Sequence, residues 1–596
     1  MTGRYEPSLM DDSTITARHD FRLVPAALLL WLSALLGLLW SAWFALAMGA
    51  AATAVAAILL WRWRTTRPRW FAGAAALLLA GILVAVPLTT RLLQAQRDPL
   101  SALAARSVGA TLRVTVTERP KPVRSAGYAG QQAGTRTVVV TADVVSAVVN
   151  GHDVRTNGRV ALLAPFQEWS RLLPGQDVTA TGKLALPRDR DLTVAVVYVR
   201  GPPAAPGSAP WWQHVAESTR AALRAASSVL SPDAAGLLPG LVVGDTSGVS
   251  SQVEREFTES GLTHLMAVSG SNLAVVAGAV LLLLRVARAG PRLSASVAGV
   301  ALIGFVVLVG SEPSVLRAGV MGAVSLLALA MGRQRSAVSA LAAAVCALIV
   351  FDPAMAVTFG FALSVLATAG LVLLAPRWVD AMTTRGVPPG VAEGIAIPFA
   401  AFVVTAPVIA GMAGQVSVVS IAANVLAAPV VAPATVLGVL TALLATLWPA
   451  GAEFTAHLAG PEAEWLILVA RHASRVPGAV LPWPGGWWGG CLAVVVLAAV
   501  VLALRRPRLR VGLALALVAV LLFLVPAKVV APGWPPSGWS VVACDVGQGD
   551  AVALATAEPG RAVLIDSGPE PGPVDECLSR LHVNRVPLVI LSHLFF

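Results

Sequence analysis

The chain has 596 residues, of which 56% are hydrophobic and only 13% are charged, and its net charge is +11. A soluble chain of this length carries about twice that share of charged residues, so the composition excludes a wholly soluble protein and indicates a membrane protein with soluble parts. Lys and Arg at cytoplasmic helix ends explain the positive charge most simply, with a DNA-facing surface as the smaller contribution.

The four cysteines are too far apart for a CxxC or other metal-ligand spacing. Cys346 and Cys491 lie in apolar runs and are interpreted as packing residues. Cys544 and Cys577 could pair in an oxidising compartment, but the prediction is that they stay unpaired.

Residues 1–22 are polar, and we predict a disordered cytoplasmic N-terminus without a cleaved signal. The following region, 23–97, contains apolar runs at 23–40, 42–60 and 70–88, which predict transmembrane helices. The arginine-rich stretch RWRTTRPR between the second and third runs predicts a cytoplasmic loop, which places the next region outside.

Residues 98–205 alternate apolar and polar side chains in five short stretches, with Gly, Pro, Asn and Asp between them. This pattern predicts a small exterior β-barrel, with an OB-fold as the obvious candidate. Such barrels often bind single strands with a basic groove and stacking aromatics, but aromatic residues are sparse here. Single-strand binding and a purely structural barrel both remain open. The aromatic residues are Tyr128, Phe166, Trp169 and Tyr198.

Residues 206–261 are predicted to be a linker and amphipathic helices, with Trp211 and Trp212 at headgroup level. Residues 262–448 form a nearly continuous apolar block, which predicts a polytopic helical core that ends in a hairpin of two spans, 415–430 and 431–448. Within 449–533 we expect an exterior interfacial helix at 451–477 and two last spans, 487–504 and 509–527.

The fold class is therefore a polytopic α-helical membrane protein of about thirteen spans with a small exterior β-barrel. The arginines lie in alternate loops, which places all of them on the cytoplasmic side of the membrane. Both soluble regions are therefore predicted to lie outside. The last segment, 534–596, predicts three strands, a helix and a fourth strand.

Three stretches of the apolar block resemble the competence domain of the ComEC DNA-uptake channels: HLMAVSGSN (264–272), SVLRAGVM (314–321) and FDPAMAVTFGFALSVLATAG (351–370). Members of that family carry an OB-like domain between N-terminal helices and the competence domain, which agrees with the predicted barrel. Many members have a histidine where this chain has Asn272, so a role that requires an imidazole there is not expected.

CDVGQGDA, LIDSGP and PLVILSH, in the last segment, resemble the opening of a metallo-β-lactamase-like α/β domain. In that family PLVILSH leads into an HxHxDH motif that binds two metal ions. Only its first histidine has a counterpart, His593, after which the chain reads LFF. We therefore expect a truncated segment with no metal site, no catalytic residue and no cofactor.

Ionisable residues inside a membrane block are costly, so each one is a candidate for function. The ionisable residues of the core either form pairs in loops and at the membrane interface, or line a translocation path. The path candidates, with the polar residues of the three motifs, are His264, Ser269, Asn272, Glu312, Arg317, Asp352 and Ser364.

The resemblance implies a channel of the cytoplasmic membrane that passes single-stranded DNA inward, with a DNA receptor and a cytoplasmic helicase as partners. Two alternatives stay open: a membrane-anchored exterior nuclease or phosphodiesterase, and an inactive product of an interrupted gene. The missing HxHxDH residues argue against the enzyme.

Overall fold

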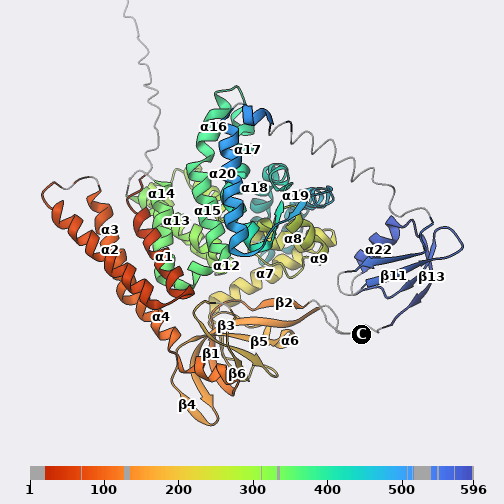
Figure 1. Cartoon of the computed structure of the whole chain (residues 1–596), viewed down its shortest axis with the longest axis horizontal. Helices are drawn as coiled ribbons and strands as arrows, with labels where there is room; N and C mark the ends of the chain where they lie inside the picture. Colours follow the sequence, from red (N-terminus) through yellow and green to blue (C-terminus); the bar gives the residue numbers. More distant parts are fainter. Residues whose placement is uncertain are drawn as a thin grey trace, which may run out of the picture.

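The computed structural model describes residues 20–66, 68, 70–125, 134–188, 190–266, 268–310, 312–331, 336–506, 508–512, 515, 538–546, 550–568 and 571–592. The predicted disordered N-terminus, most of the predicted span 509–527, and His593 lie outside these residues. A helical bundle, a barrel below it and a small α/β segment make up the described chain (Figure 1).

The N-terminal helices are α1 (Val24–Leu39), α2 (Ala42–Arg62) and α3 (Phe71–Leu83). Pro87 lacks an N–H group, and around it the helix widens into a π turn, η1 (Val84–Leu88), before continuing as α4 (Thr89–Gln96) and α5 (Pro99–Ala105). Gly49 and Gly81 bring α2 and α3 together, since a Cβ at Gly81 would lie 2.9 Å from the Thr53 nitrogen.

Five strands then close into the predicted small barrel: β1 (Gly109–Val116), β3 (Gly134–Val149), β5 (Arg159–Pro165), β6 (Asp177–Ala185) and β7 (Thr193–Val199). Their order around the barrel is β1-β6-β7-β5-β3, and β3 pairs back with β1. Only β5 and β7 run parallel within this ring. Two short strands, β2 (Lys121–Ser125) and β4 (His152–Val154), extend β3.

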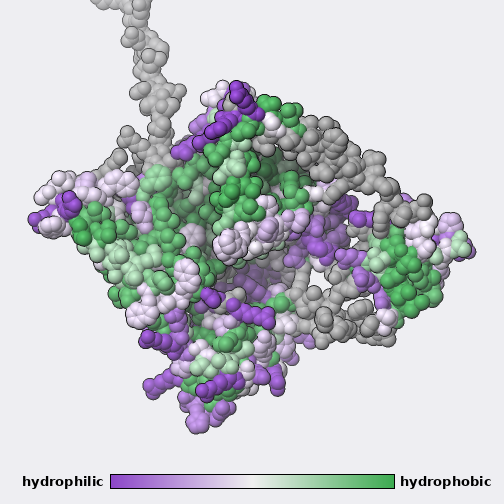
Figure 2. Space-filling view, in the orientation of Figure 1, coloured by the Kyte–Doolittle hydropathy of each residue, from purple (hydrophilic) through white to green (hydrophobic). Residues whose placement is uncertain are grey.

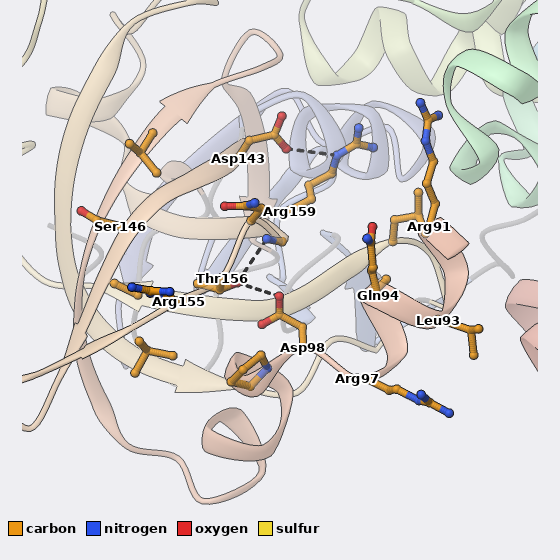
Figure 3. Close-up of a pocket in the computed structure, with 18 of the residues that line it drawn as sticks. Arg91, Leu93, Gln94, Arg97, Asp98, Asp143, Ser146, Arg155, Thr156 and Arg159 are labelled. Atoms are coloured by element: carbon orange, nitrogen blue, oxygen red, sulfur yellow. Dashed lines mark hydrogen bonds and ion pairs between the residues drawn. The ribbon is translucent and has the colours of Figure 1, made fainter. Parts of the chain in front are cut away.

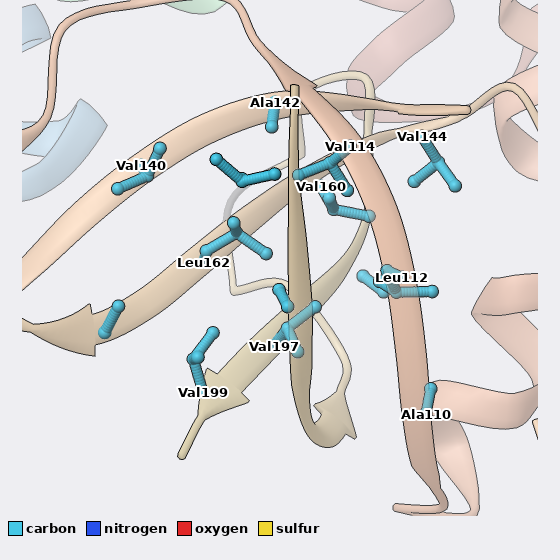
Figure 4. Packing of buried hydrophobic residues seen from close by; sticks show 14 of the residues in the cluster. Ala110, Leu112, Val114, Val140, Ala142, Val144, Val160, Leu162, Val197 and Val199 are labelled. Atoms are coloured by element: carbon cyan, nitrogen blue, oxygen red, sulfur yellow. The ribbon is translucent and has the colours of Figure 1, made fainter. Parts of the chain in front are cut away.

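Alternation along the strands fills the barrel with apolar side chains, as Figure 4 shows for Leu112, Val140 and Leu162. Trp169 of the short helix α6 (Phe166–Trp169) is fully buried in the same core. The period-two pattern predicted this barrel because each strand has one face inside and one outside.

After the barrel come α7 (Trp211–Ser227), α8 (Pro232–Val243), α9 (Ser251–Glu259) and the single turn α10 (Thr263–Met266). Helix α8 is buried over nearly its whole length in a core shared with later helices. Trp211 is 72% exposed, and its place at a membrane interface stays a prediction.

The central helices run up and down: α11 (Gly270–Val286), α12 (Pro291–Val309), α13 (Pro313–Ala330), α14 (Ala337–Phe351) and α15 (Phe359–Leu373). A 3-10 turn, η2 (Pro353–Val357), joins α14 to α15. The short amphipathic helix α16 (Ala375–Thr383) leads to α17 (Pro389–Ala413).

The predicted hairpin of spans 415–430 and 431–448 is wrong, because α18 (Ser420–Ala445) is one continuous helix with Pro429 and Pro433 inside it. Proline is tolerated in such helices when the surroundings satisfy the freed backbone groups. The return helix is α19 (Pro449–Ser474), which packs along α18 through small residues such as Ala459 and Ala463. The strand β8 (Gln415–Ser417), before α18, pairs with β9 (Val480–Pro482), after α19. The helix α20 (Gly486–Arg505) follows.

Among the described residues, seven helices are long and apolar enough to cross a membrane, and five shorter helices are apolar. Hydrophobic residues cover the bundle, and hydrophilic ones gather on the barrel and around α16 (Figure 2). These features fit a multi-pass helical membrane protein. The count of thirteen spans and the interfacial position of residues 451–477 stay predictions.

The C-terminal segment contains β10 (Val541–Asp545), β11 (Asp550–Ala555), β12 (Arg561–Ile565), α22 (Pro571–Arg580) and β13 (Arg585–Ile590). The four strands lie in chain order, and β13 runs parallel to β12. The prediction that Cys544 and Cys577 stay unpaired is wrong: they form a disulfide, with their Cα atoms 6.0 Å apart. Because α22 packs against β10, it brings together cysteines 33 residues apart.

Candidate translocation site in the helical bundle

The three motifs of the apolar block meet around one buried side chain, that of Arg317 on α13. Arg317 is only 6% exposed. Its Nε donates a hydrogen bond of 2.7 Å to Ser364 Oγ on α15, and its Nη1 lies 3.2 Å from Met321 Sδ. Its Nη2 faces the first residue of α11, because a Cβ added at Gly270 would lie 2.8 Å from that atom. Residues far apart in the sequence thus form one polar cluster.

Val268 and Ser269, which directly precede α11, are not helical. The single turn α10 ends at Met266, and Ser269 is extended, with φ −96° and ψ 160°. Ser314 Oγ of α13 donates a hydrogen bond of 3.0 Å to the Val268 carbonyl. Inside a bilayer, irregular backbone is tolerated only where protein or a water-filled cavity surrounds it. The irregular backbone at Val268 is therefore held by α13, which also carries Arg317.

Asn272 fastens the start of α11 to the end of α8. It is 3% exposed, and its Nδ2 donates a hydrogen bond of 2.8 Å to the Leu241 carbonyl. Ser269 Oγ donates to Asn272 Oδ1 at 3.1 Å. The Leu241 carbonyl lies in the last turn of α8, where carbonyls have no intrahelical partner. The amide of Asn272 supplies that partner.

Glu312 and Asp352 do not join the Arg317 cluster; both pair with cations of the barrel. Lys121 Nζ lies 3.8 Å from Glu312 Oε1, and Arg159 Nη1 donates to Asp352 Oδ2 at 3.0 Å. Asp352 also accepts a 3.0 Å bond from the Ala354 nitrogen, which starts the turn η2. The side chain of His264 on α10 is exposed. Of the seven candidates, Arg317, Ser364, Ser269 and Asn272 lie around the start of α11.

A second charged cluster, which the sequence analysis missed, connects α7 with the barrel. Glu217 accepts hydrogen bonds from Arg220 Nε at 3.0 Å, from Arg224 Nη2 at 3.1 Å and from Arg119 Nη2 at 3.4 Å. The fully buried Arg220 also donates to the Leu308 carbonyl at 2.6 Å. The spacing of Glu217, Arg220 and Arg224 puts them on one helix face. This spacing is the sequence feature from which the cluster could have been predicted.

Burial by itself raises the pKa of the Glu217 carboxyl, but the charge of Arg220, the hydrogen bond from Arg224 and the charge of Arg119 together lower it below its usual value. Asp245, which follows α8, behaves similarly: burial raises its pKa, and bonds from Ser247 and Arg224 lower it overall. Both groups are therefore carboxylates at neutral pH. They hold the arginines that lie between the barrel and the bundle.

A cavity of about 1000 Å³ lies where the barrel meets α4 and α5 (Figure 3). Arg91 at its rim donates to the Val350 and Phe351 carbonyls at 2.8 and 3.0 Å. Asp98 accepts a 2.7 Å bond from Thr156, and Asp143 lies 3.7 Å from Arg159. Since carboxylates and guanidinium groups alternate in the lining, the cavity is not a uniformly basic groove.

No group of three or more His, Cys, Asp and Glu side chains within the described residues is arranged to hold a metal ion. His593, the one counterpart of a metal-binding motif, lies outside those residues.

The part of the chain that contains the Arg317 cluster is similar to known proteins. The family described as "Competence protein" matches residues 241–508. ComE operon protein 3 of Bacillus subtilis (strain 168) is 29% identical over 224 residues, which are 36% of this chain and 27% of that protein. No solved structure matches.

Proposed function

We propose, from the premise that residues 241–508 are a competence-protein domain of the ComEC type, that the chain is a membrane channel for the uptake of single-stranded DNA. One observation carries the proposal: three family motifs meet inside a helical bundle around the buried Arg317, which has no ion-pair partner among the residues that the structure describes. A charged side chain buried in a membrane bundle is costly, and such side chains commonly mark substrate pathways.

The position of the barrel supports an orientation with the barrel outside. Among the described residues, those of the barrel bond to one end of the helices: Arg190 to the Leu39 carbonyl, Lys121 to Glu312 and Arg159 to Asp352. The opposite helix ends carry exposed arginines. These are Arg62, Arg64, Arg285, Arg288, Arg292, Arg377, Arg385, Arg505 and Arg506. An excess of arginine in short loops marks the cytoplasmic side, so we assign the barrel to the exterior of the cytoplasmic membrane.

The barrel is OB-like in our proposal, since five strands close with a single parallel pair. Of its aromatic residues, Trp169 is fully buried and serves the core, whereas Tyr198 is 52% exposed. This distribution favours a barrel that guides the strand by its backbone over one that stacks successive bases. An exterior DNA receptor and a cytoplasmic helicase complete the proposed pathway on either side of the bilayer.

Complementation tests the function. The chain is expressed in a naturally transformable host that lacks its own competence channel, with membrane insertion checked by immunoblot. We expect transformation and the entry of labelled DNA into a nuclease-protected state. Arg292→Ala, in a loop at the arginine-rich end, is the matched control and should transform like the parent. A parent chain that reaches the membrane and restores neither readout would reject the channel.

A further inference from the structure

We propose that the cavity between α4, α5 and the barrel binds the headgroup of a zwitterionic phospholipid, which carries both a phosphodiester and an ammonium group. The proposal goes beyond DNA uptake and rests on three observations. The cavity lies at the level of the membrane surface, three charged side chains that line it have no partner, and these charges are of both signs.

Helix α2 shows where the membrane surface lies. It is a candidate span of 21 residues, and at 1.5 Å per residue it is about 32 Å long, which matches a hydrocarbon core of about 30 Å. Exposed tryptophans lie at both of its ends, Trp43 in the first turn and Trp61 in the last. Tryptophan is enriched at both membrane–water interfaces. The first turn of α2 therefore lies at the membrane surface on the side of the barrel.

The cavity begins at this level. A Cβ added at Gly37 of α1 would lie 2.5 Å from Leu92 Cδ1 and 3.2 Å from Ala45 Cβ, so Leu92 of α4 lies beside the first turn of α2. Arg91, the residue before Leu92, lines the cavity, and the chain continues along it to Asp98 (Figure 3). The polar layer outside the hydrocarbon core is about 5–8 Å thick on each side. This end of the cavity therefore lies at the depth of the lipid headgroups.

Three charged side chains of the lining are available to a ligand. Among the described residues, the side chains of Arg97, Arg155 and Asp153 form neither an ion pair nor a hydrogen bond. All three are exposed, and Figure 3 shows Arg97 and Arg155 on opposite sides of the cavity. The other charged groups of the lining already bond to backbone carbonyls, to Thr156 or to opposite charges.

The mixture of charges selects the class of ligand. A phosphodiester oxygen accepts hydrogen bonds from a guanidinium, whereas an ammonium group donates them to a carboxylate. A zwitterionic headgroup offers both groups, so its phosphodiester meets Arg97 and Arg155 and its ammonium meets Asp153. A DNA backbone offers phosphodiesters alone, and the three aspartates of the lining would repel it. We therefore assign the cavity to the lipid.

Native mass spectrometry of the full-length chain in detergent tests the site with two lipids. Phosphatidylethanolamine has the ammonium group, and phosphatidylglycerol has the phosphodiester without it. The parent chain should retain one phosphatidylethanolamine and bind it more tightly than phosphatidylglycerol. The double variant Arg97→Ala/Arg155→Ala should bind both lipids about tenfold or more weakly, because charge-assisted hydrogen bonds are lost. Asp153→Asn should weaken the binding of phosphatidylethanolamine alone.

The matched controls are Arg171→Ala and Glu168→Gln, which change exposed barrel residues outside the cavity and should bind both lipids like the parent. An unchanged elution profile on size exclusion checks that each variant folds, as expected for exposed side chains. Parent-like binding of both lipids by the double variant and by Asp153→Asn would overturn the site. Tighter binding of phosphatidylglycerol by the parent, or equal weakening of both lipids in Asp153→Asn, would overturn the zwitterionic headgroup as ligand.

A fluorescent oligothymidylate is the third probe and distinguishes the lipid from DNA. The double variant and Asp153→Asn should bind it like the parent. Oligothymidylate binding that the double variant loses and Asp153→Asn strengthens, with the binding of both lipids unchanged, would assign the cavity to DNA and overturn the proposal.

Discussion

At the scale of residues, Glu217 carries the interactions that hold α7 against the barrel. Its carboxylate receives Arg119 from the barrel and Arg220 and Arg224 from its own helix. Because Arg220 also bonds to the end of α12, the loss of one carboxylate leaves a buried guanidinium without its counter-charge. The position of the barrel therefore depends on the ionisation of this group.

That dependence predicts a response to pH. The folded pKa of Glu217 lies below its ordinary value of 4.5. Its stabilisation is thus fully present above the unfolded pKa and is lost as the pH falls through the lower folded pKa. We expect Glu217→Gln to lower the melting temperature at pH 7 and to reduce its fall upon acidification. Tryptophan fluorescence of the solubilised protein measures both. Glu168→Gln, on the exposed side of α6, should behave like the parent at every pH.

Asn272 offers a second test at this scale. Asn272→Ala leaves the buried Leu241 carbonyl without its donor, which should cost about 1–3 kcal/mol of folding free energy. The thermal transition of the solubilised protein should fall accordingly, whereas Asn157→Ala, at an exposed position of the barrel, should leave it unchanged. An unchanged transition in Asn272→Ala would mean that water satisfies the carbonyl.

The sequence indicated Arg317, Asn272 and Ser364 because they stand in motifs, but it did not indicate their partners. Arg159 and Asp352 are 193 residues apart, and only the closed barrel brings them together. Glu217 was missed for a related reason: an amphipathic helix with arginines on one face usually exposes that face. Here the barrel covers it.

At the scale of elements, strand alternation and long apolar runs predicted most of the fold. Buried apolar residues recur at every second position along the barrel strands, and that pattern does not depend on the surroundings of the barrel. The wrong hairpin in α18 has a local cause. Two prolines in an uninterrupted apolar stretch predict two short spans, because proline usually ends a helix. In α18, however, one long helix contains both prolines, since neighbouring helices can support it. The helix that packs along α18 is α19. Nothing in the sequence of either helix indicates the other as its packing partner.

The disulfide between β10 and α22 allows a test at this scale. Cys544→Ser removes a cross-link between residues 33 positions apart, which should destabilise the C-terminal segment by about 2–4 kcal/mol. Limited proteolysis should cut this segment faster in the variant and in reduced parent protein, while the bundle stays intact. Cys491→Ser, which changes a free cysteine, is the control. Equal cleavage of oxidised parent and variant would contradict the prediction.

At the scale of the whole molecule, the barrel and the exposed arginines lie at opposite ends of the same helices. This separation follows from local rules: each helix reverses direction, and the loops at one end carry most of the arginines. In the part of the chain that the structure describes, the barrel is fastened at the other end, where Glu312 and Asp352 pair with its cations. In the proposed channel, a DNA strand that passes the barrel reaches Pro313, the first residue of α13 and four residues before Arg317, before it meets the apolar body of the bundle.

Cysteine labelling in intact cells tests this arrangement. The background carries Cys346→Ala and Cys491→Ser, which removes the free thiols and keeps the Cys544–Cys577 disulfide. Single cysteines are then placed at Lys183, on the outer surface of the barrel, and at Arg506, after α20; both positions are exposed. A membrane-impermeant maleimide should label Lys183→Cys in intact cells and Arg506→Cys only after permeabilisation, because arginine-rich loops stay in the cytoplasm. Labelling of Arg506→Cys but not Lys183→Cys in intact cells would place the barrel in the cytoplasm, and a DNA strand entering through the proposed channel would then reach the barrel last.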